Sequence, residues 1–145
     1  MTPEILKWLL ATHAFVTLFM TGLIWFVQVV HYPLFALVGN SEFASYEKKN
    51  TRRTGWVVGA PMLLELCLSI GLVVSPGGLL PWSGLALLSM IWLSTGLLQV
   101  PLHQRLEEGF DPTSHRRLVT GNWLRTICWS LRGILAIWMI IEMGP

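Results

Sequence analysis

Four side chains that could take part in binding or catalysis lie near the start of the last apolar stretch of the chain. They are Asn122, Arg125, Trp129 and Arg132. Their spacing of three and four residues places them on one face of a helix. Two arginines inside so apolar a stretch cost several kcal/mol if they face lipid, so we expect this face to meet protein or trapped water. We therefore expect polar groups elsewhere in the chain to pair with these arginines.

A glutamate in another apolar stretch is the simplest partner for one of them. Glu65 lies nine residues after Trp56. Arg132 lies nine residues after Trp123. If both stretches start at the same membrane surface, both groups lie roughly 13 Å deep, near the middle of the bilayer. We predict that Glu65 and Arg132 form an ion pair, which on one interpretation only locks two helices together.

A second set of polar side chains falls where the apolar stretches end, all on one side of the predicted membrane. The set comprises Gln28, His31, Gln99, His103, Asn122 and Arg125, with Arg53 and Tyr46 nearby. Because neighbours within a stretch are three or four residues apart, they share helix faces. This pattern favours a polar pocket that opens to that side and has Glu65 and Arg132 as its floor. Hydrated helix ends without a ligand are the alternative.

Several chemistries can be compared with this set. His31 and His103 could hold a haem iron or another metal, although no haem motif surrounds them. A di-iron site needs several glutamates, and Glu65 is the one glutamate in the interior of an apolar stretch, because Glu142 lies at the end of the last stretch. No Ser-His-Asp set, cysteine nucleophile or phosphate-binding glycine loop is visible. Cofactor-free proton transfer or oxygenation needs a base and cationic donors around an enolate-like substrate, which this set supplies, and an organic-anion site would use the same residues.

The elements that carry these residues are long enough to cross a bilayer. Of the 145 residues, 53% are hydrophobic and 12% charged, whereas soluble domains have about 25% charged residues. Four stretches provide the roughly 20 apolar residues of a crossing: Ile5–Val30, Trp56–Ser75, Leu79–Leu102 and Trp123–Met143. We predict a single all-α domain over residues 1–145, a polytopic membrane protein with a four-transmembrane-helix bundle. The net charge of +2, without a basic tail, gives no indication of nucleic-acid binding.

The basic residues predict the orientation of this bundle. Seven of them lie between the first and second or the third and fourth stretches: Lys48, Lys49, Arg52, Arg53, Arg105, Arg116 and Arg117. The opposite side has only Lys7. The positive-inside rule then places both of these loops in the cytoplasm and both termini outside. The polar pocket would therefore open toward the cytoplasm.

Local signals predict short surface helices and the helix boundaries. Asn40-Ser41 can cap a short helix that begins near Glu42 and lies against the cytoplasmic membrane surface. Tyr32-Pro33 is expected to end or kink the first stretch. Asp111-Pro112 is typical of an N-cap followed by proline in the first turn, so the last helix is predicted to begin at Pro112.

Three stretches resemble a bacterial family of small, uncharacterised four-helix membrane proteins: Gln28–Phe35, Arg52–Glu65 and Gln99–Arg132. More distantly, Asn122-Trp123-Leu124-Arg125 is similar to a signature of anthrone-oxygenase-like membrane proteins, a group that includes cofactor-free oxygenases acting on polycyclic phenols. The resemblance implies a four-helix bundle in the bacterial inner membrane, with a small-molecule site that involves Asn122 and Arg125. In that group a histidine follows the loop tyrosine by four residues, and here that position is Asn50.

Three functional hypotheses follow. In the first, the pocket binds a hydrophobic aromatic or quinone-like compound for oxidoreductase chemistry, with His31 or His103 as base or ligand and Arg125 and Asn122 holding developing negative charge. The ligand-binding or supporting residues would be Gln28, Gln99, Glu65, Arg132 and Arg53. In the second, the protein is a non-catalytic accessory or assembly subunit whose polar residues specify helix packing. In the third it is a transporter, for which four helices are few unless it forms a homo-oligomer.

Overall fold

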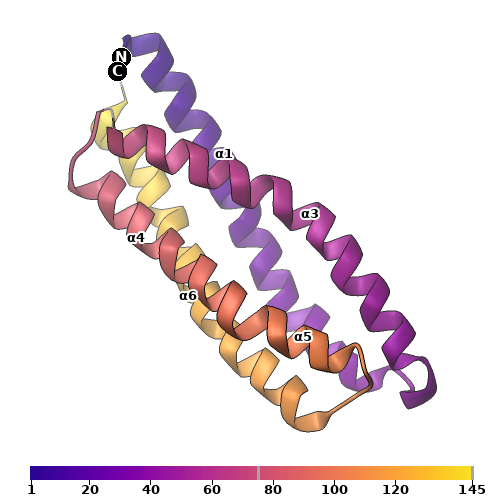
Figure 1. Cartoon of the computed structure of the whole chain (residues 1–145). Coiled ribbons are helices and arrows are strands. Elements are labelled where there is room, and N and C mark those ends of the chain that lie inside the picture. The colour runs from indigo at the N-terminus through magenta and orange to yellow at the C-terminus, as the bar shows by residue number, and fades with distance from the viewer. Residues whose placement is uncertain (75, 145) are drawn as a thin grey trace.

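The computed structural model describes residues 1–74 and 76–144, and this part of the chain is helical (Figure 1). The first helical stretch comprises α1 (Pro3–Phe26), the π-helix η1 (Val27–His31), α2 (Tyr32–Leu34) and the 3₁₀ helix η2 (Phe35–Leu37). The others are α3 (Asn40–Val74), then α4 (Leu79–Ser94) with η3 (Thr95–Gln99, π) and α5 (Val100–Leu106), and finally α6 (Pro112–Met143). Within the described residues, these four stretches are long and apolar enough to cross a membrane, as predicted.

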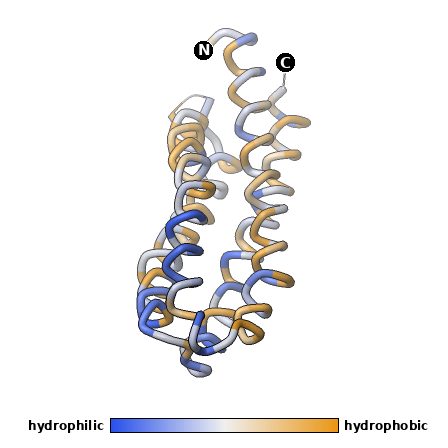
Figure 2. Tube along the Cα trace, turned by 90° about the vertical axis from the view of Figure 1, so that its right-hand side faces the viewer, coloured by the Kyte–Doolittle hydropathy of each residue, from blue (hydrophilic) through white to orange (hydrophobic). Residues whose placement is uncertain are grey.

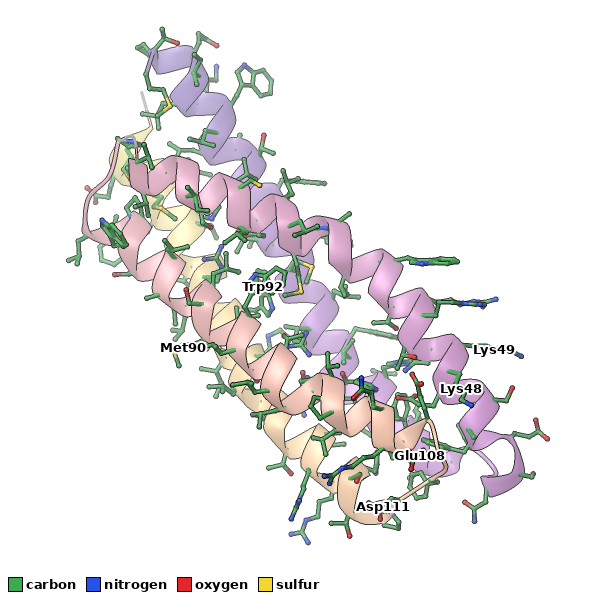
Figure 3. The ribbon with its side chains drawn as sticks, in the orientation of Figure 1. Lys48, Lys49, Met90, Trp92, Glu108 and Asp111 are labelled. Atoms are coloured by element: carbon green, nitrogen blue, oxygen red, sulfur yellow. The ribbon has the colours of Figure 1, made fainter. Side chains whose placement is uncertain are left out.

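The four stretches pack side by side as a bundle. Both termini and the connection between α3 and α4 lie at one end, which we call the terminal end (Figure 1). The connections at residues 38–39 and 107–111 lie at the opposite end, which we call the loop end. Lys48, Lys49, Glu108 and Asp111 project at the loop end, while Met90 and Trp92 lie at mid-height (Figure 3).

The outer surface of the bundle is apolar and part of its interior is polar. Large apolar side chains are exposed along the whole length, among them Phe15, Trp56, Leu79 and Leu97. The most hydrophilic segments gather in the half of the molecule away from the termini (Figure 2). Glu47, Glu65 and Arg132, by contrast, are almost fully buried. Apolar residues outside and charges inside are the pattern expected of a protein whose solvent is lipid.

The second helix is longer than predicted. The sequence predicts a separate surface helix near Glu42 followed by a membrane segment over 56–75, but α3 continues unbroken from Asn40 to Val74. The first turns stay in line because they pack on the bundle: Glu47 bonds to His103, and Thr51 donates to Glu107. No separate surface helix forms there, which corrects the prediction. The predicted end at Ser75 lies outside the described residues.

Two π-turns carry the chain past prolines that would otherwise break a helix. Pro33 and Pro101 each come two residues after a π-helix, η1 and η3. A proline ring clashes with the carbonyl four residues earlier, and the wider π-turn relieves this clash at the cost of one extra residue. The helix therefore continues beyond Tyr32-Pro33, where the sequence predicts an end or kink. Each π-turn places a buried glutamine in the bundle, Gln28 in η1 and Gln99 in η3.

The last helix begins at Pro112, as predicted, and Asp111 is its N-cap. The Asp111 carboxylate accepts hydrogen bonds from the backbone N–H groups of Thr113 at 3.2 Å and Ser114 at 2.8 Å. These bonds satisfy two of the N–H groups that have no partner inside the helix. The cap therefore fixes where α6 starts and how the α5–α6 connection enters the bundle.

We expect acid to loosen the first turn of α6 through this cap. Hydrogen bonds from Ser114, from the side chain and then the backbone, lower the pKa of the Asp111 carboxyl below its ordinary value of 3.8. A carboxyl whose folded pKa is lowered stabilises the fold above its unfolded pKa, and this contribution is lost as pH falls through the folded pKa. Amide hydrogen exchange at residues 113–115, corrected for the intrinsic rate, should therefore speed up below about pH 4. Asp111→Ser keeps a cap without the charge, and an identical acid response in that variant would contradict the prediction.

A polar layer divides the hydrophobic core. One cluster, centred on Phe35, Phe43 and Trp129, fills the loop half, and a smaller one with Leu10, Leu72 and Met139 fills the terminal end. Between them lie the buried polar side chains of His13, Thr17, Glu65, Ser69 and Arg132. The bundle therefore has two distinct polar regions, this central layer and the loop half described next.

Candidate functional site

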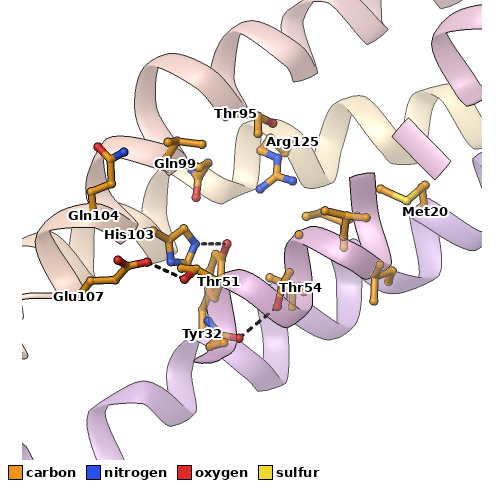
Figure 4. A pocket seen from close by; sticks show the side chains of 17 residues that line it. Met20, Tyr32, Thr51, Thr54, Thr95, Gln99, His103, Gln104, Glu107 and Arg125 are labelled. Atoms are coloured by element: carbon orange, nitrogen blue, oxygen red, sulfur yellow. Dashed lines mark hydrogen bonds between the residues drawn. The ribbon is translucent and has the colours of Figure 1, made fainter. Parts of the chain in front are cut away.

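A cavity of about 280 Å³ lies in the loop half of the bundle, and we call it the loop-end pocket (Figure 4). It lies between α1, α3, the η3–α5 segment and α6. Its polar lining residues are Tyr32, Asn50, Thr51, Thr54, Thr95, Gln99, His103, Gln104, Glu107 and Arg125. The rest of its wall is apolar, with Met20, Leu23, Ile24, Val27, Val58 and Val100. An apolar cavity with a few convergent polar groups is the usual form of a small-molecule site.

Arg125 supplies a cation to this pocket that no carboxylate neutralises. Its side chain is 7% exposed, and Nη1 donates to Asn122 Oδ1 at 3.1 Å. The Nε group has no hydrogen-bond partner, and among the described residues no carboxylate lies within 4.0 Å of this guanidinium. A buried guanidinium with free donors is a strong site for an anion or a developing negative charge.

Two predicted site residues hold Arg125 in place without lining the pocket. Asn122 donates to Gln28 Oε1 at 2.9 Å, and Gln28 donates to the Val119 carbonyl at 3.1 Å. Both side chains are buried, and neither belongs to the pocket wall. The resulting chain runs from the η1 π-turn to the guanidinium of Arg125. Asn122 and Gln28 are therefore positioning residues for Arg125.

Asn122→Ala should test this support. The change leaves Gln28 Oε1 without its donor and Arg125 without an acceptor, and each buried unsatisfied group costs about 1–3 kcal/mol. We expect a lower unfolding temperature in mild detergent, and Gln28→Ala should give a smaller loss because it leaves the Arg125–Asn122 bond intact. Thr120→Ala, at an exposed position of the same helix, serves as the control. If Asn122→Ala were as stable as that control, the bonds would be unimportant.

Gln99 contributes a second unsatisfied polar group. It is 2% exposed, and neither its amide nitrogen nor its amide oxygen has a partner in the described part of the chain. It points into the pocket from η3 (Figure 4). Gly121 leaves room behind it, since a Cβ there would lie 3.4 Å from the Gln99 Nε2 atom. Buried amides are normally hydrogen-bonded, so an open donor and acceptor in a cavity wall indicate a ligand or ordered water.

His103 lies at the centre of a line of three hydrogen-bonded side chains. Its Nδ1 bonds to the Glu47 carboxylate, and its Nε2 lies 2.9 Å from the Tyr32 hydroxyl, which reaches the pocket wall. In the neutral imidazole, Nδ1–H donates to Glu47 and Nε2 accepts from Tyr32. The Glu47 side chain is 0% exposed. This arrangement, which we call the Tyr32 relay, can accept a proton at the pocket and stabilise the resulting imidazolium.

Sequence reasoning missed two members of this relay. Glu47 was hidden because the predicted surface helix would leave it in water, whereas the unbroken α3 buries it. A signal existed, since Phe43, Glu47 and Thr54 recur at helical spacing and share the inner face of α3. Tyr32 was considered only as the start of a break, and the π-turn instead carries it into the core.

Two other predicted site residues lie outside the pocket wall. His31 Nε2 bonds to Asn50 Oδ1 at 2.8 Å, and Asn50 Nδ2 donates to Glu47 at 3.0 Å. His31 therefore supports the relay indirectly, because it holds the Asn50 side chain that bonds to Glu47. Arg53, for which the sequence suggests a ligand-binding role, is exposed and is not among the residues that line the pocket. His31 Nε2 and both ring nitrogens of His103 have side-chain partners, and no group of three metal-binding side chains converges among residues 1–74 and 76–144.

The predicted ion pair of Glu65 and Arg132 forms, but it is not the floor of the pocket. Arg132 Nη2 bonds to Glu65 Oε2 in the central polar layer. Glu65 is 0% and Arg132 1% exposed. Neither residue is among those that line the loop-end pocket. The prediction of the pair is confirmed, and the expectation that the two groups close the pocket is corrected.

The central polar layer surrounds this pair with partners from α1, α3 and α4, although Arg132 Nε has no partner among the described residues. Thr17 donates to Glu65 Oε1, and Arg132 donates to the Gly84 carbonyl of α4. Arg132 Nη2 also lies 3.2 Å from the Ser69 hydroxyl and 3.3 Å from His13 Nε2. The layer connects α1, α3, α4 and α6, so it fixes their register.

Comparison with protein-family models, with curated proteins and with solved structures finds no match for this chain. The site must therefore be understood from its own geometry. That geometry combines a general base relay, an unneutralised cation and an unsatisfied amide around one cavity. Such a set can bind a polar head group and take a proton from it.

Proposed function

We propose that this chain is a multi-pass membrane protein that binds a hydrophobic phenol or quinone-like compound in the loop-end pocket and, when that compound carries a phenolic hydroxyl, removes the hydroxyl proton. One observation carries the proposal: the Tyr32 relay ends in the pocket wall, and Arg125 faces the same cavity with no carboxylate partner in the described part of the chain. A relay alone could be structural, and a cation alone could bind any anion. Together they accept a proton and stabilise the negative charge that remains.

The proton moves in two coupled transfers. The phenolic hydroxyl of the ligand gives its proton to the Tyr32 oxygen, while the Tyr32 proton passes to His103 Nε2. The imidazolium that forms is stabilised by the Glu47 carboxylate. The phenolate that remains is stabilised by Arg125 and by the free amide of Gln99. No charge is left without a partner at the end of this step.

Tyrosine is itself a phenol, so a ligand phenol can give its proton to Tyr32 as Tyr32 gives its own to His103. Phenolate is a stronger base than imidazole, so this net transfer requires that its products be stabilised. Arg125 stabilises the ligand phenolate, and Glu47 stabilises the imidazolium. Loss of the proton makes an aromatic ring easier to oxidise, and an acceptor such as molecular oxygen would act on this activated form. This is the sense in which we propose an oxidoreductase or oxygenase-like activity.

Charge distribution supports an orientation in a bacterial cytoplasmic membrane. The basic residues gather at the loop end, including Lys48 and Lys49, while both termini lie at the opposite end (Figures 1 and 3). We propose that the loop end faces the cytoplasm and that both termini face outward. Arg52 stacks over Trp56 at 5.7 Å, a pairing that suits the membrane–water boundary at this height.

A nitrophenol with an alkyl tail would test the proposed function. Its phenolate absorbs visible light, and its methyl ether has the same shape without an acidic proton. In detergent-solubilised protein we expect the phenol to bind at least tenfold more tightly than the ether, because only the phenol can exploit Arg125. Equal affinities for the two compounds would refute the proposal.

A further inference from the structure

The loop-end pocket is open on the side where α3 faces the η3–α5 segment. Gly55 of α3 and Val100 and Gln104 of α5 line the cavity and are also exposed on the outer surface. The opposite wall is formed by α1 and by the buried Arg125. A Cβ built on Gly55 has no heavy atom within 4 Å, so this position leaves a gap in the wall. We call this opening the α3–α5 window.

The window is closed toward the loop end. Two polar bridges connect α3 to α5 there, one between Glu47 and His103 and one in which Thr51 donates to Glu107 at 2.6 Å. Past these bridges, in the direction of the terminal end, the pocket wall from Thr54 to Val58 has no polar bond to the facing helix. These bridges narrow the access from the loop end, while access from the side remains.

The outer rim of the window is suited to lipid. Trp56, which follows the lining residue Gly55, is 72% exposed, and Leu97, three residues before the lining residue Val100, is 71% exposed. Val100 extends this apolar rim on the α5 side. Trp56 stacks with Arg52, a pairing typical of the boundary between head groups and acyl chains. The opening therefore faces the part of the hydrocarbon layer that lies next to the head groups on the loop-end side.

We propose that the pocket takes its ligand sideways from the bilayer through the α3–α5 window, and that this ligand is a tailed phenol. Its head lies at Tyr32 and Arg125, and its apolar tail stays in the membrane beside Gly55 and Val100. This inference rests on the proposed function and adds the route and the ligand class. The volume supports it, because about 280 Å³ is near the lower limit of ligand cavities and suits a ring without a long chain.

A bulky residue in the window should separate tailed from tailless ligands. We would reconstitute Gly55→Trp in phosphatidylcholine vesicles and measure binding of the tailed nitrophenol and of tailless nitrophenol. An indole at this position should fill the α3–α5 window, through which the alkyl tail of the probe would pass. The space at Tyr32 and Arg125, where the aromatic head would bind, should stay open. We expect affinity for the tailed probe to fall at least tenfold and affinity for the tailless probe to change less than about threefold. Val100→Trp, on the other rim, should act in the same way.

Val57→Trp is the matched control, because Val57 is 51% exposed beside the window and does not line the pocket. It should bind both probes as the unmodified protein does. If Gly55→Trp and Val100→Trp bind the tailed probe normally, or lose both probes equally, the window is not the route. If the unmodified protein binds the tailed nitrophenol no more tightly than its methyl ether, the proposed function itself fails. The two failures are therefore distinguishable.

Discussion

Arg132→Met should lower the free energy of unfolding by about 3–5 kcal/mol, the range found when one partner of a buried ion pair is removed. The substitution leaves the Glu65 carboxylate, which is 0% exposed, without its cation. It also removes the donors to the Gly84 carbonyl and the Ser69 hydroxyl. No water or counter-ion can replace them cheaply in the middle of the bundle.

A double variant separates the charge from the volume. Glu65→Leu combined with Arg132→Met replaces both charges by apolar side chains of similar size. Such replacements are often neutral or stabilising, so most of the lost stability should return. The measurement is loss of helicity in a titration with a denaturing detergent, with the exposed Glu4→Gln as the control. If Arg132→Met unfolded within about 1 kcal/mol of the control, the central polar layer would not specify the packing.

Arg125→Met should weaken binding of the tailed nitrophenol by about 10- to 150-fold, which corresponds to the 1.5–3 kcal/mol of a hydrogen bond to a charged group. Methionine keeps most of the volume and apolar contact of the arginine stem while removing the charge. Binding of the methyl ether should change little, because the ether carries no charge that Arg125 could stabilise. The measurement is equilibrium titration of both compounds against each purified variant.

Arg53→Met provides the control for this experiment. Arg53 is an arginine of the same half of the bundle, but it is exposed and lies outside the pocket wall. Its loss should leave both affinities within about twofold of the starting values, because an exposed charge is screened by solvent. An equal loss in Arg53→Met and Arg125→Met would mean that only general surface charge attracts the phenolate.

The lengths of the apolar stretches and the positions of charges within them were enough to predict the number of helices and the depth of the buried ion pair in the bundle. Four apolar stretches require four helices, and two charges nine residues inside them were expected to meet, as Glu65 and Arg132 do. The Asp111-Pro112 signal marked the start of α6 correctly. These features follow from the cost of burying charge and from the capping of helix ends, both of which are local or nearly so.

The features that depend on tertiary packing could not be predicted in the same way. The sequence predicts a short helix near Glu42 and a separate stretch from Trp56, but α3 packs on the bundle as one helix, which buries Glu47 beside His103. A π-turn before Pro33 shifts the register by one residue, so Tyr32, and not His31, meets His103. The polar residues of the loop half were therefore identified in part, but their division into pocket wall and support required the three-dimensional structure.

The ionisation of the bound nitrophenol tests the central claim most directly. Visible absorbance of the tailed probe, titrated with pH on the protein and on Arg125→Met, gives the apparent pKa of the bound phenol in each. The account predicts a pKa at least about 1 unit lower on the unmodified protein, because one unit corresponds to 1.36 kcal/mol of preference for the phenolate. The same pKa on both proteins, or a higher one on the unmodified protein, would show that Arg125 does not stabilise a phenolate and would contradict the account.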